Sequence, residues 1–107
     1  MRYEIILAPE AVEDLRSLKA DMRAAVRDAL ETHLRHEPKK TSQSRIKRLR
    51  RVSRPQWRLR VGELRIFYDV AEGTVEVLAI VSKSDARAWL EKMGERDEGS
   101  GTIENQR

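Results

Sequence analysis

The chain has 107 residues, 39% of them hydrophobic and 37% charged, with a formal net charge of +4. This length favours one domain, and the lack of an apolar run of about 18 residues argues against a membrane-spanning helix. Zero cysteines exclude disulfides and thiolate metal sites, and two histidines are too few for a typical zinc cluster, so neither metal nor cofactor is expected. The first residues lack a secretory signal pattern, so we expect a cytoplasmic protein without membrane contact.

Charge is distributed unevenly along the chain. Residues 39–65 contain 11 of the 22 Lys and Arg residues and one acid, Glu63. Residues 1–38 contain six bases and eight acids, and residues 66–107 contain five bases and nine acids. A basic middle between acidic ends is typical of a protein that binds a polyanion such as nucleic acid, and it also suits an acidic protein partner.

The first third of the chain predicts a strand and two helices. Residues 2–7 predict a short strand, and Pro9 and Glu10 suit the first turn of a helix of roughly ten residues. Asp21 is the expected cap of a second helix with an apolar stripe, and Pro38 ends that helix. The two helices are close enough in sequence to form a hairpin.

The basic middle predicts a β-hairpin after an irregular segment. Residues 39–45 are polar and irregular, and residues 46–55 are compatible with a short strand or with an extended arm. Residues 57–70 then predict two strands, because Gly62-Glu63 has the chemistry of a type II′ turn. One face of this hairpin is apolar at every second residue, which is the pattern of a strand that packs on a core.

The other face of the predicted hairpin carries arginines. Closing the turn places Arg60 directly opposite Arg65, with Arg58 two residues along on the same face. Two like charges opposite each other destabilise a sheet, so this face favours the binding of an anion. Nucleic-acid phosphate is the natural candidate.

The last part of the chain predicts a strand, a helix and a tail. Residues 75–81 are almost wholly apolar and predict the central strand, and Ser84 or Asp85 is the expected cap of a last helix. Residues 95–107 lack periodicity and predict a disordered tail after a domain that spans residues 1–94. The expected fold is α+β: a helical hairpin covers one face of a four-stranded, largely antiparallel sheet, and the other face is open.

This order of elements resembles the RelE/ParE toxins of bacterial and archaeal type II toxin–antitoxin pairs. The resemblance covers residues 2–93, and the matching stretches are IKRLRRVSRPQWRLRVGELRIFYDV and VEVLAIVSKSDA. The family pattern Tyr/Trp-Arg-x-Arg-x-Gly-x-Tyr-Arg-x-x-Tyr is matched by WRLRVGELRIFY except at Leu64. The resemblance implies a cognate acidic antitoxin, and contact with operator DNA only through that antitoxin.

One branch of the family consists of ribosome-dependent mRNA endoribonucleases. In these toxins the 2′-hydroxyl of the RNA attacks the adjacent phosphate without a metal, so the implied partners are the ribosome and its mRNA. The resemblance places Arg65 at the transition-state arginine, and Arg58 and Arg60 where that branch often has two lysines. Arg58 and Arg60 would hold the phosphates that flank the cut. The ParE branch keeps the fold and inhibits DNA gyrase, and a third possibility is a catalytically weakened member that acts through antitoxin binding and operator repression.

Other basic residues are candidates for supporting roles. Lys83 is the candidate general base if desolvation lowers its pKa, and its alternative role is that of a surface lysine. Phosphate contacts to RNA are expected from a larger basic set: Lys47, Arg48, Arg50, Arg51 and Arg87. The alternatives are a solvated basic arm, an antitoxin-docking face for Arg58 and Arg60, and an Arg65–Asp69 ion pair.

Two sequence features weaken the case for catalysis. Asp85 falls near a position where the endoribonuclease branch has an arginine, and no Tyr or His follows Tyr68, so the general acid is unassigned.

Phe67 lies on the arginine face, where it suits stacking on a base or packing under the last helix or an antitoxin. Trp89 suits a helix-to-sheet anchor.

Overall fold

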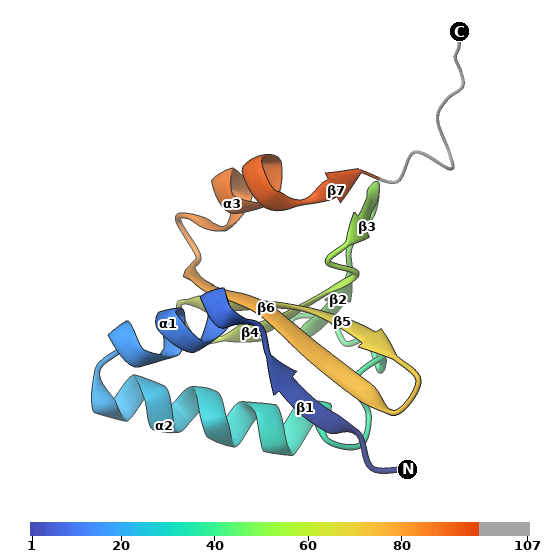
Figure 1. The fold of residues 1–107 in the computed structure, drawn as a ribbon, viewed down its shortest axis with the longest axis horizontal. Coiled ribbons are helices and arrows are strands. Elements are labelled where there is room, and N and C mark those ends of the chain that lie inside the picture. Colours follow the sequence, from blue (N-terminus) through green and yellow to red (C-terminus); the bar gives the residue numbers. More distant parts are fainter. Residues whose placement is uncertain (97–107) are drawn as a thin grey trace, which may run out of the picture.

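A five-stranded sheet separates two layers in the computed structural model, which describes residues 1–96 (Figure 1). The elements, in chain order, are β1 (Glu4–Leu7), α1 (Pro9–Ser17), α2 (Ala20–Ala29), the π-helical turn η1 (Leu30–Leu34), β2 (Ile46–Arg48), β3 (Val52–Arg54), β4 (Trp57–Val61), β5 (Leu64–Ala71), β6 (Thr74–Ser82), α3 (Ala86–Met93) and β7 (Glu95–Arg96). The α+β fold class is as the sequence predicts. No helix in this described part is long and apolar enough to cross a membrane.

The sheet has the strand order β1-β6-β5-β4-β2. β1 runs parallel to β6, and the other neighbours are antiparallel. The fifth strand comes from the segment 46–55, which forms β2 and β3 rather than a free arm. Because β2 adds to the far edge, β5 is the middle strand, and the predicted central strand, β6, lies one place away from the centre.

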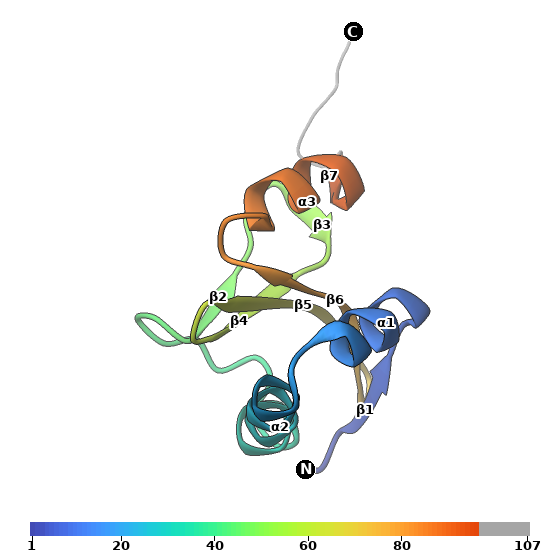
Figure 2. The same cartoon turned by 90° about the vertical axis from the view of Figure 1, so that its left-hand side faces the viewer.

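The helical hairpin covers one face of the sheet, as the sequence predicts (Figure 2). The apolar stripes of α1, α2 and η1 pack on the apolar face of the strands because both surfaces leave water together. The buried cluster between them consists of Ala11, Leu15, Val26, Leu30, Leu34, Ile46, Trp57, Leu59, Leu64, Ile66, Tyr68, Val75, Val77 and Ile80. This core holds β4 and β5 in place from below.

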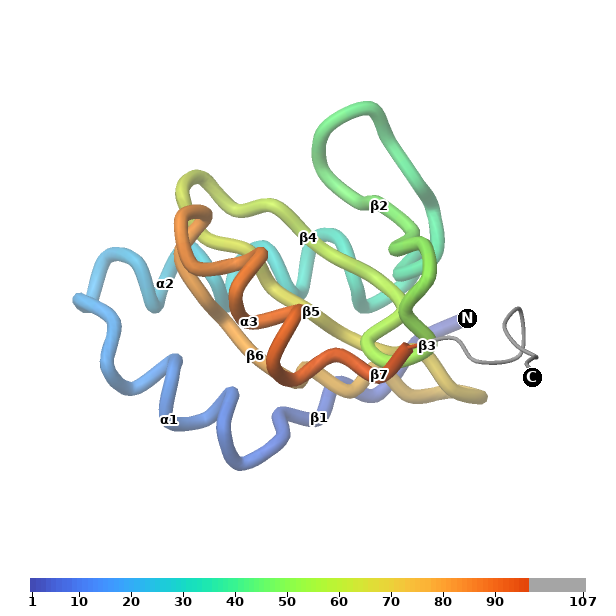
Figure 3. The backbone as a smooth tube through the Cα atoms, turned by 90° about the horizontal axis from the view of Figure 1, so that it is seen from above, coloured from blue at the N-terminus to red at the C-terminus, as the bar shows by residue number. Residues whose placement is uncertain are grey.

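The opposite face of the sheet carries a second, smaller layer. α3 and the two-stranded β3–β7 sheet lie on this side, over β5 and β6 in the view from above (Figure 3). Glu95 and Arg96, which the sequence places in the tail, form β7 because they pair with β3. The other residues of the predicted tail, 97–107, lie outside the described residues.

The helix ends differ in part from the sequence-based expectation. α1 begins with Pro9, but α2 is preceded by Lys19, and no side chain caps it. Asp21 is therefore not the cap; it lies in the first turn, where its charge complements the helix dipole. Pro38 follows the π-helical turn and is buried, and its carbonyl oxygen accepts a 2.6 Å hydrogen bond from the Tyr68 hydroxyl.

The burial of Tyr68 is expected to lower the free energy of unfolding at alkaline pH. Its side chain is fully buried, and burial raises the pKa of its phenol. The unfolded chain loses this proton near pH ~10, whereas the folded chain keeps it. The contribution of Tyr68 to the free energy of unfolding is therefore complete below about pH 10. As the pH rises further, this contribution falls by about 1.4 kcal/mol per pH unit.

We predict that Tyr68→Phe removes the part of the alkaline decrease in the free energy of unfolding that comes from Tyr68. Urea unfolding at several pH values up to 11 should show a difference between wild type and variant that shrinks with rising pH. Groups other than Tyr68 titrate in both proteins and cancel. A difference that stays constant with pH would contradict the prediction.

Candidate nucleic-acid interface

The hairpin of β4 and β5 has the predicted register. Arg60 pairs with Arg65, and Arg58 pairs with Phe67. Gly62 has a φ of 57°, and Glu63 is not in the left-handed region, which is the pattern of a type II′ turn. The turn thus brings the three arginines to one face, and Arg58, Arg60 and Arg65 are called the guanidinium cluster below.

Arg65 is the most enclosed member of the cluster. Its side chain is 8% exposed, and its Nη1 donates to the carbonyl oxygens of Gly62 and Leu64 at 2.9 Å each. The alternative ion pair with Asp69 does not form. The Asp69 carboxylate instead accepts the Gln56 N–H at 2.7 Å and lies 3.6 Å from the Arg54 guanidinium.

Arg58 is half-buried and incompletely hydrogen-bonded. Its Nη2 donates to the carbonyl oxygen of Ser44 at 3.2 Å, but its Nε is buried without a partner among the described residues. Burial, followed by repulsion from Arg65 and Arg60, lowers the pKa of Arg58. A buried N–H without an acceptor is costly, so this atom favours an oxygen ligand from outside the chain.

Arg60 completes the cluster on its solvent side. Its side chain is exposed, and its backbone N–H donates to the carbonyl oxygen of Arg45 at 2.8 Å. None of the ion pairs among residues 1–96 involves a member of the cluster. Three cations therefore lie together without a neutralising carboxylate, which is the electrostatic requirement of a phosphate site.

The arginine face is less open than the sequence suggests. The ring of Trp89 in α3 stacks on Phe67 at 5.0 Å between centroids and 4° between planes. Phe67 is consequently fully buried, and the contact confirms Trp89 as a helix-to-sheet anchor. The expectation of an open face is wrong on this side, because α3 uses the one aromatic residue of the arginine face as its docking point.

The basic residues of the segment 46–51 divide between the two faces. Lys47 pairs with Arg58 and is exposed beside the cluster. Arg48 lies on the other face, where its guanidinium carbon is 5.3 Å from the centre of the Trp57 ring and its Nη1 donates to the Gln56 carbonyl. Arg50 and Arg51 are exposed in the turn between β2 and β3.

Lys83 and Arg87 lie at the end of the hairpin where β6 leads into α3. The backbone N–H of Lys83 donates to the Glu63 carbonyl at 2.7 Å, which fixes this segment beside the turn. The side chains of Lys83 and Arg87 are exposed. The structure thus places Lys83 beside the hairpin turn and Arg87 in the first turn of α3, and exposed Lys83 lacks the desolvation expected of a general base.

Sequence reasoning missed the loop that supports the cluster. The Ser44 carbonyl accepts from Arg58, and the Arg45 carbonyl accepts from Arg60. The Ser42 hydroxyl shapes this loop by accepting the backbone N–H groups of Arg45 and Ile46, at 2.9 and 3.1 Å. A serine four residues before a basic strand was the available signal, because serine hydroxyls commonly close such turns.

Proton-transfer groups are scarce around the cluster. Tyr68 is buried in the core, and His33 and His36 belong to the layer of α2 and η1, across the sheet from the cluster. Among residues 1–96, no three His, Asp or Glu side chains are grouped closely enough to hold a metal ion. The arrangement is suited to binding and stabilising negative charge, because arginine does not readily release a proton.

The fold is shared with solved toxin structures. The toxin–antitoxin complex RelBE2 of Mycobacterium tuberculosis matches with a TM-score of 0.65 and 26% identity over 77% of this chain and 99% of the matched chain. The RelB-RelE complex of Methanococcus jannaschii matches at 0.61 and 18% identity, over 78% and 96%. The YoeB dimer of Staphylococcus aureus matches at 0.58 and 18% identity, over 76% and 97%. These similarities place the fold among RelE-like toxins.

A family model assigns the chain more specifically. The model of the ParE toxin of the type II toxin-antitoxin system, parDE, matches residues 5–87. The chain therefore belongs to this family of toxins. No functionally curated protein matches its sequence.

We predict that inorganic phosphate stabilises the protein through the cluster. A bound ligand stabilises the folded state by about 1.4 kcal/mol when its concentration is roughly ten times the dissociation constant. Urea unfolding in phosphate and in chloride at equal ionic strength should show a larger gain for wild type than for Arg60→Gln. Arg27→Gln, which removes an exposed charge from α2, serves as the matched control and should gain as much as wild type. An equal gain for all three proteins would contradict the prediction.

Proposed function

We propose that this toxin is a ribosome-dependent mRNA endoribonuclease that inhibits translation and is neutralised by a cognate acidic antitoxin. The observation that supports the proposal is the guanidinium cluster, in which the buried Nε of Arg58 lacks a partner. RNA phosphate is a suitable ligand for these donors because its oxygens accept several charge-assisted hydrogen bonds at once. The RelB-type antitoxins in the matched complexes support the proposed partner.

The proposed reaction uses a nucleophile that belongs to the RNA. The 2′-oxygen forms a bond to the adjacent phosphorus, and the bond from phosphorus to the 5′-oxygen breaks. The products are a 2′,3′-cyclic phosphate and a 5′-hydroxyl end. The 2′-hydroxyl loses a proton to a base, and the leaving 5′-oxygen gains one from an acid.

The cluster acts on the charge that develops at phosphorus. Arg65 is held by two carbonyl oxygens, so its guanidinium is preorganised toward the phosphorane. Arg58 and Arg60 hold the flanking oxygens. Lys83 lies beside the turn and is exposed in the free protein, so its proposed role as proton acceptor requires that bound RNA and the ribosome cover it. The ribosome supplies the remaining proton-transfer groups.

The surrounding basic residues would orient the RNA and the ribosome. Lys47, Arg50, Arg51 and Arg87 are exposed and suit contacts to phosphates that carry no sequence information. Arg48 contributes less, because its guanidinium is already engaged with Trp57 and Gln56.

A second candidate function is inhibition of DNA gyrase without any chemistry. The matched family model is that of ParE, and no Tyr or His side chain of residues 1–96 adjoins the cluster. A binding function requires no acid or base. Purified protein would then block supercoiling and stabilise cleaved DNA.

Primer extension on translating ribosomes tests the first proposal. We expect cuts in the ribosomal A site with wild type and with Arg27→Gln. We also expect a loss of about 10²-fold with Arg60→Gln, because one stabilising charge is removed from the transition state. Arg60 is exposed, so this variant should fold as wild type does.

Two outcomes would overturn the proposal of ribosome-dependent cleavage. The first is an absence of cuts together with a block of gyrase supercoiling, which supports the second candidate. The second is normal growth on expression without an antitoxin, which leaves antitoxin binding and operator repression as the remaining task. Cuts that Arg60→Gln does not reduce would contradict the assigned role of the cluster.

A further inference from the structure

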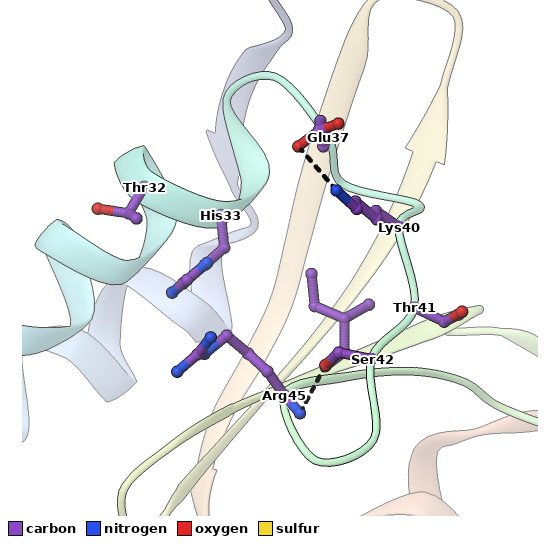
Figure 4. A pocket seen from close by; sticks show the side chains of 8 residues that line it. Thr32, His33, Glu37, Lys40, Thr41, Ser42 and Arg45 are labelled. Atoms are coloured by element: carbon purple, nitrogen blue, oxygen red, sulfur yellow. Dashed lines mark hydrogen bonds and ion pairs between the residues drawn. The ribbon is translucent and has the colours of Figure 1, made fainter.

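A pocket on the helical side of the loop lies outside the proposed reaction site. It lies between η1 and the loop 39–46 and has a volume of about 230 Å³ (Figure 4). This volume is below the roughly 300–1,000 Å³ of pockets for drug-sized ligands, so it suits one small group. Its charged and titratable side chains are those of His33, Glu37, Lys40 and Arg45.

The walls of this pocket are held in place before any ligand binds. The Ser42 hydroxyl accepts two backbone N–H groups, those of Arg45 and Ile46. The Ser42 N–H donates to the carbonyl oxygen of Ile46 at 3.0 Å, so the loop closes on itself. At the exposed rim, the Lys40 Nζ lies 3.9 Å from the Glu37 Oε1. A preorganised loop reduces the entropy lost on binding.

The pocket contains one carboxylate, that of Glu37, and this carboxylate is paired with Lys40 rather than with Arg45. The side chains of His33 and Arg45 point toward each other (Figure 4), and Arg45 makes no ion pair with any described residue. Burial, followed by repulsion from Arg45, lowers the pKa of His33, and Asp28 on α2 opposes this weakly. The Lys40–Glu37 pair is exposed, so it is weak and easily rearranged.

We propose that this pocket binds a phosphate group, held between the His33 imidazole and the Arg45 guanidinium with Lys40 at the rim. A phosphate dianion relieves the repulsion between the two groups and accepts hydrogen bonds from both. The pocket is separate from the guanidinium cluster but connected to it, because the carbonyl oxygen of Arg45 accepts the Arg60 N–H. The phosphate source is an RNA strand or free phosphate, which share this chemistry.

The two histidines of the chain allow a direct test by NMR. The imidazole signals of the full-length protein are followed against pH in phosphate and in chloride at equal ionic strength. Bound phosphate should raise the pKa of His33 by about 1, because an opposite charge favours the imidazolium. His36 is exposed and lies outside the pocket, so its titration serves as an internal reference.

Matched variants separate the pocket from general charge effects. Arg45→Gln should weaken phosphate binding by about fivefold, in line with the loss of one exposed ion pair. Lys39→Gln removes a charge from the same loop without lining the pocket and should leave binding unchanged. An unchanged His33 titration in phosphate, or equal binding by Arg45→Gln and wild type, would overturn the proposal.

A second arm identifies the source of the phosphate. A short 2′-O-methyl oligonucleotide cannot be cleaved by attack of its own 2′-oxygen. If it shifts the His33 signals at lower concentration than inorganic phosphate does, the pocket binds a strand. If inorganic phosphate shifts them and the oligonucleotide does not, the pocket binds free phosphate. Neither readout depends on RNA cleavage, so failure here leaves the proposed reaction untouched.

Discussion

The opposition of Arg60 and Arg65 across the hairpin is the constraint on which the rest of the structure depends. The tight turn at Gly62 fixes the register, and the register places the two arginines directly opposite each other on one face of the sheet. Arg65 is partly compensated because it donates to two carbonyl oxygens of its own turn. Arg58 gains one carbonyl and keeps a buried N–H without a partner. The guanidinium cluster of the free protein thus lacks an anionic partner among residues 1–96.

The two layers around the sheet serve this arrangement differently. The helical hairpin buries the apolar face of β4 and β5, the two strands that carry the arginines on their other face. On the other face, α3 rests on Phe67 through Trp89 and encloses the site from one side. Enclosure excludes water and strengthens each charge–charge interaction, because the local dielectric constant falls. Arg65 is buried on the middle strand, between Arg60 of β4 and Val81 of β6, whereas Arg60 is exposed.

The parts of the fold that the sequence predicts well are governed by local chemistry. The hairpin register follows from Gly62-Glu63 and from alternation of apolar residues, and both act within a few residues. The strands β2, β3 and β7 have only two or three residues each, too few for a pattern. β3 also depends on pairing with β7, more than 40 residues later in the chain. The cover over Phe67 depends on how α3 docks, which no local pattern encodes. The Arg58 contact to Ser44 also required the path of the loop.

The most direct test of the central claim is the coupling between Arg60 and Arg65 in the free protein. The free energy of unfolding is measured for wild type, Arg60→Gln, Arg65→Gln and the double variant, so that the hydrogen bonds lost with Arg65 cancel in the cycle. If the two guanidiniums repel, Arg60→Gln should be more stabilising by about 0.5 kcal/mol when Arg65 is present than when it is absent. Phosphate should reduce or reverse this difference, because the bound anion offsets the repulsion and Arg60 helps to hold it. An equal effect of Arg60→Gln in both backgrounds without phosphate would contradict the account.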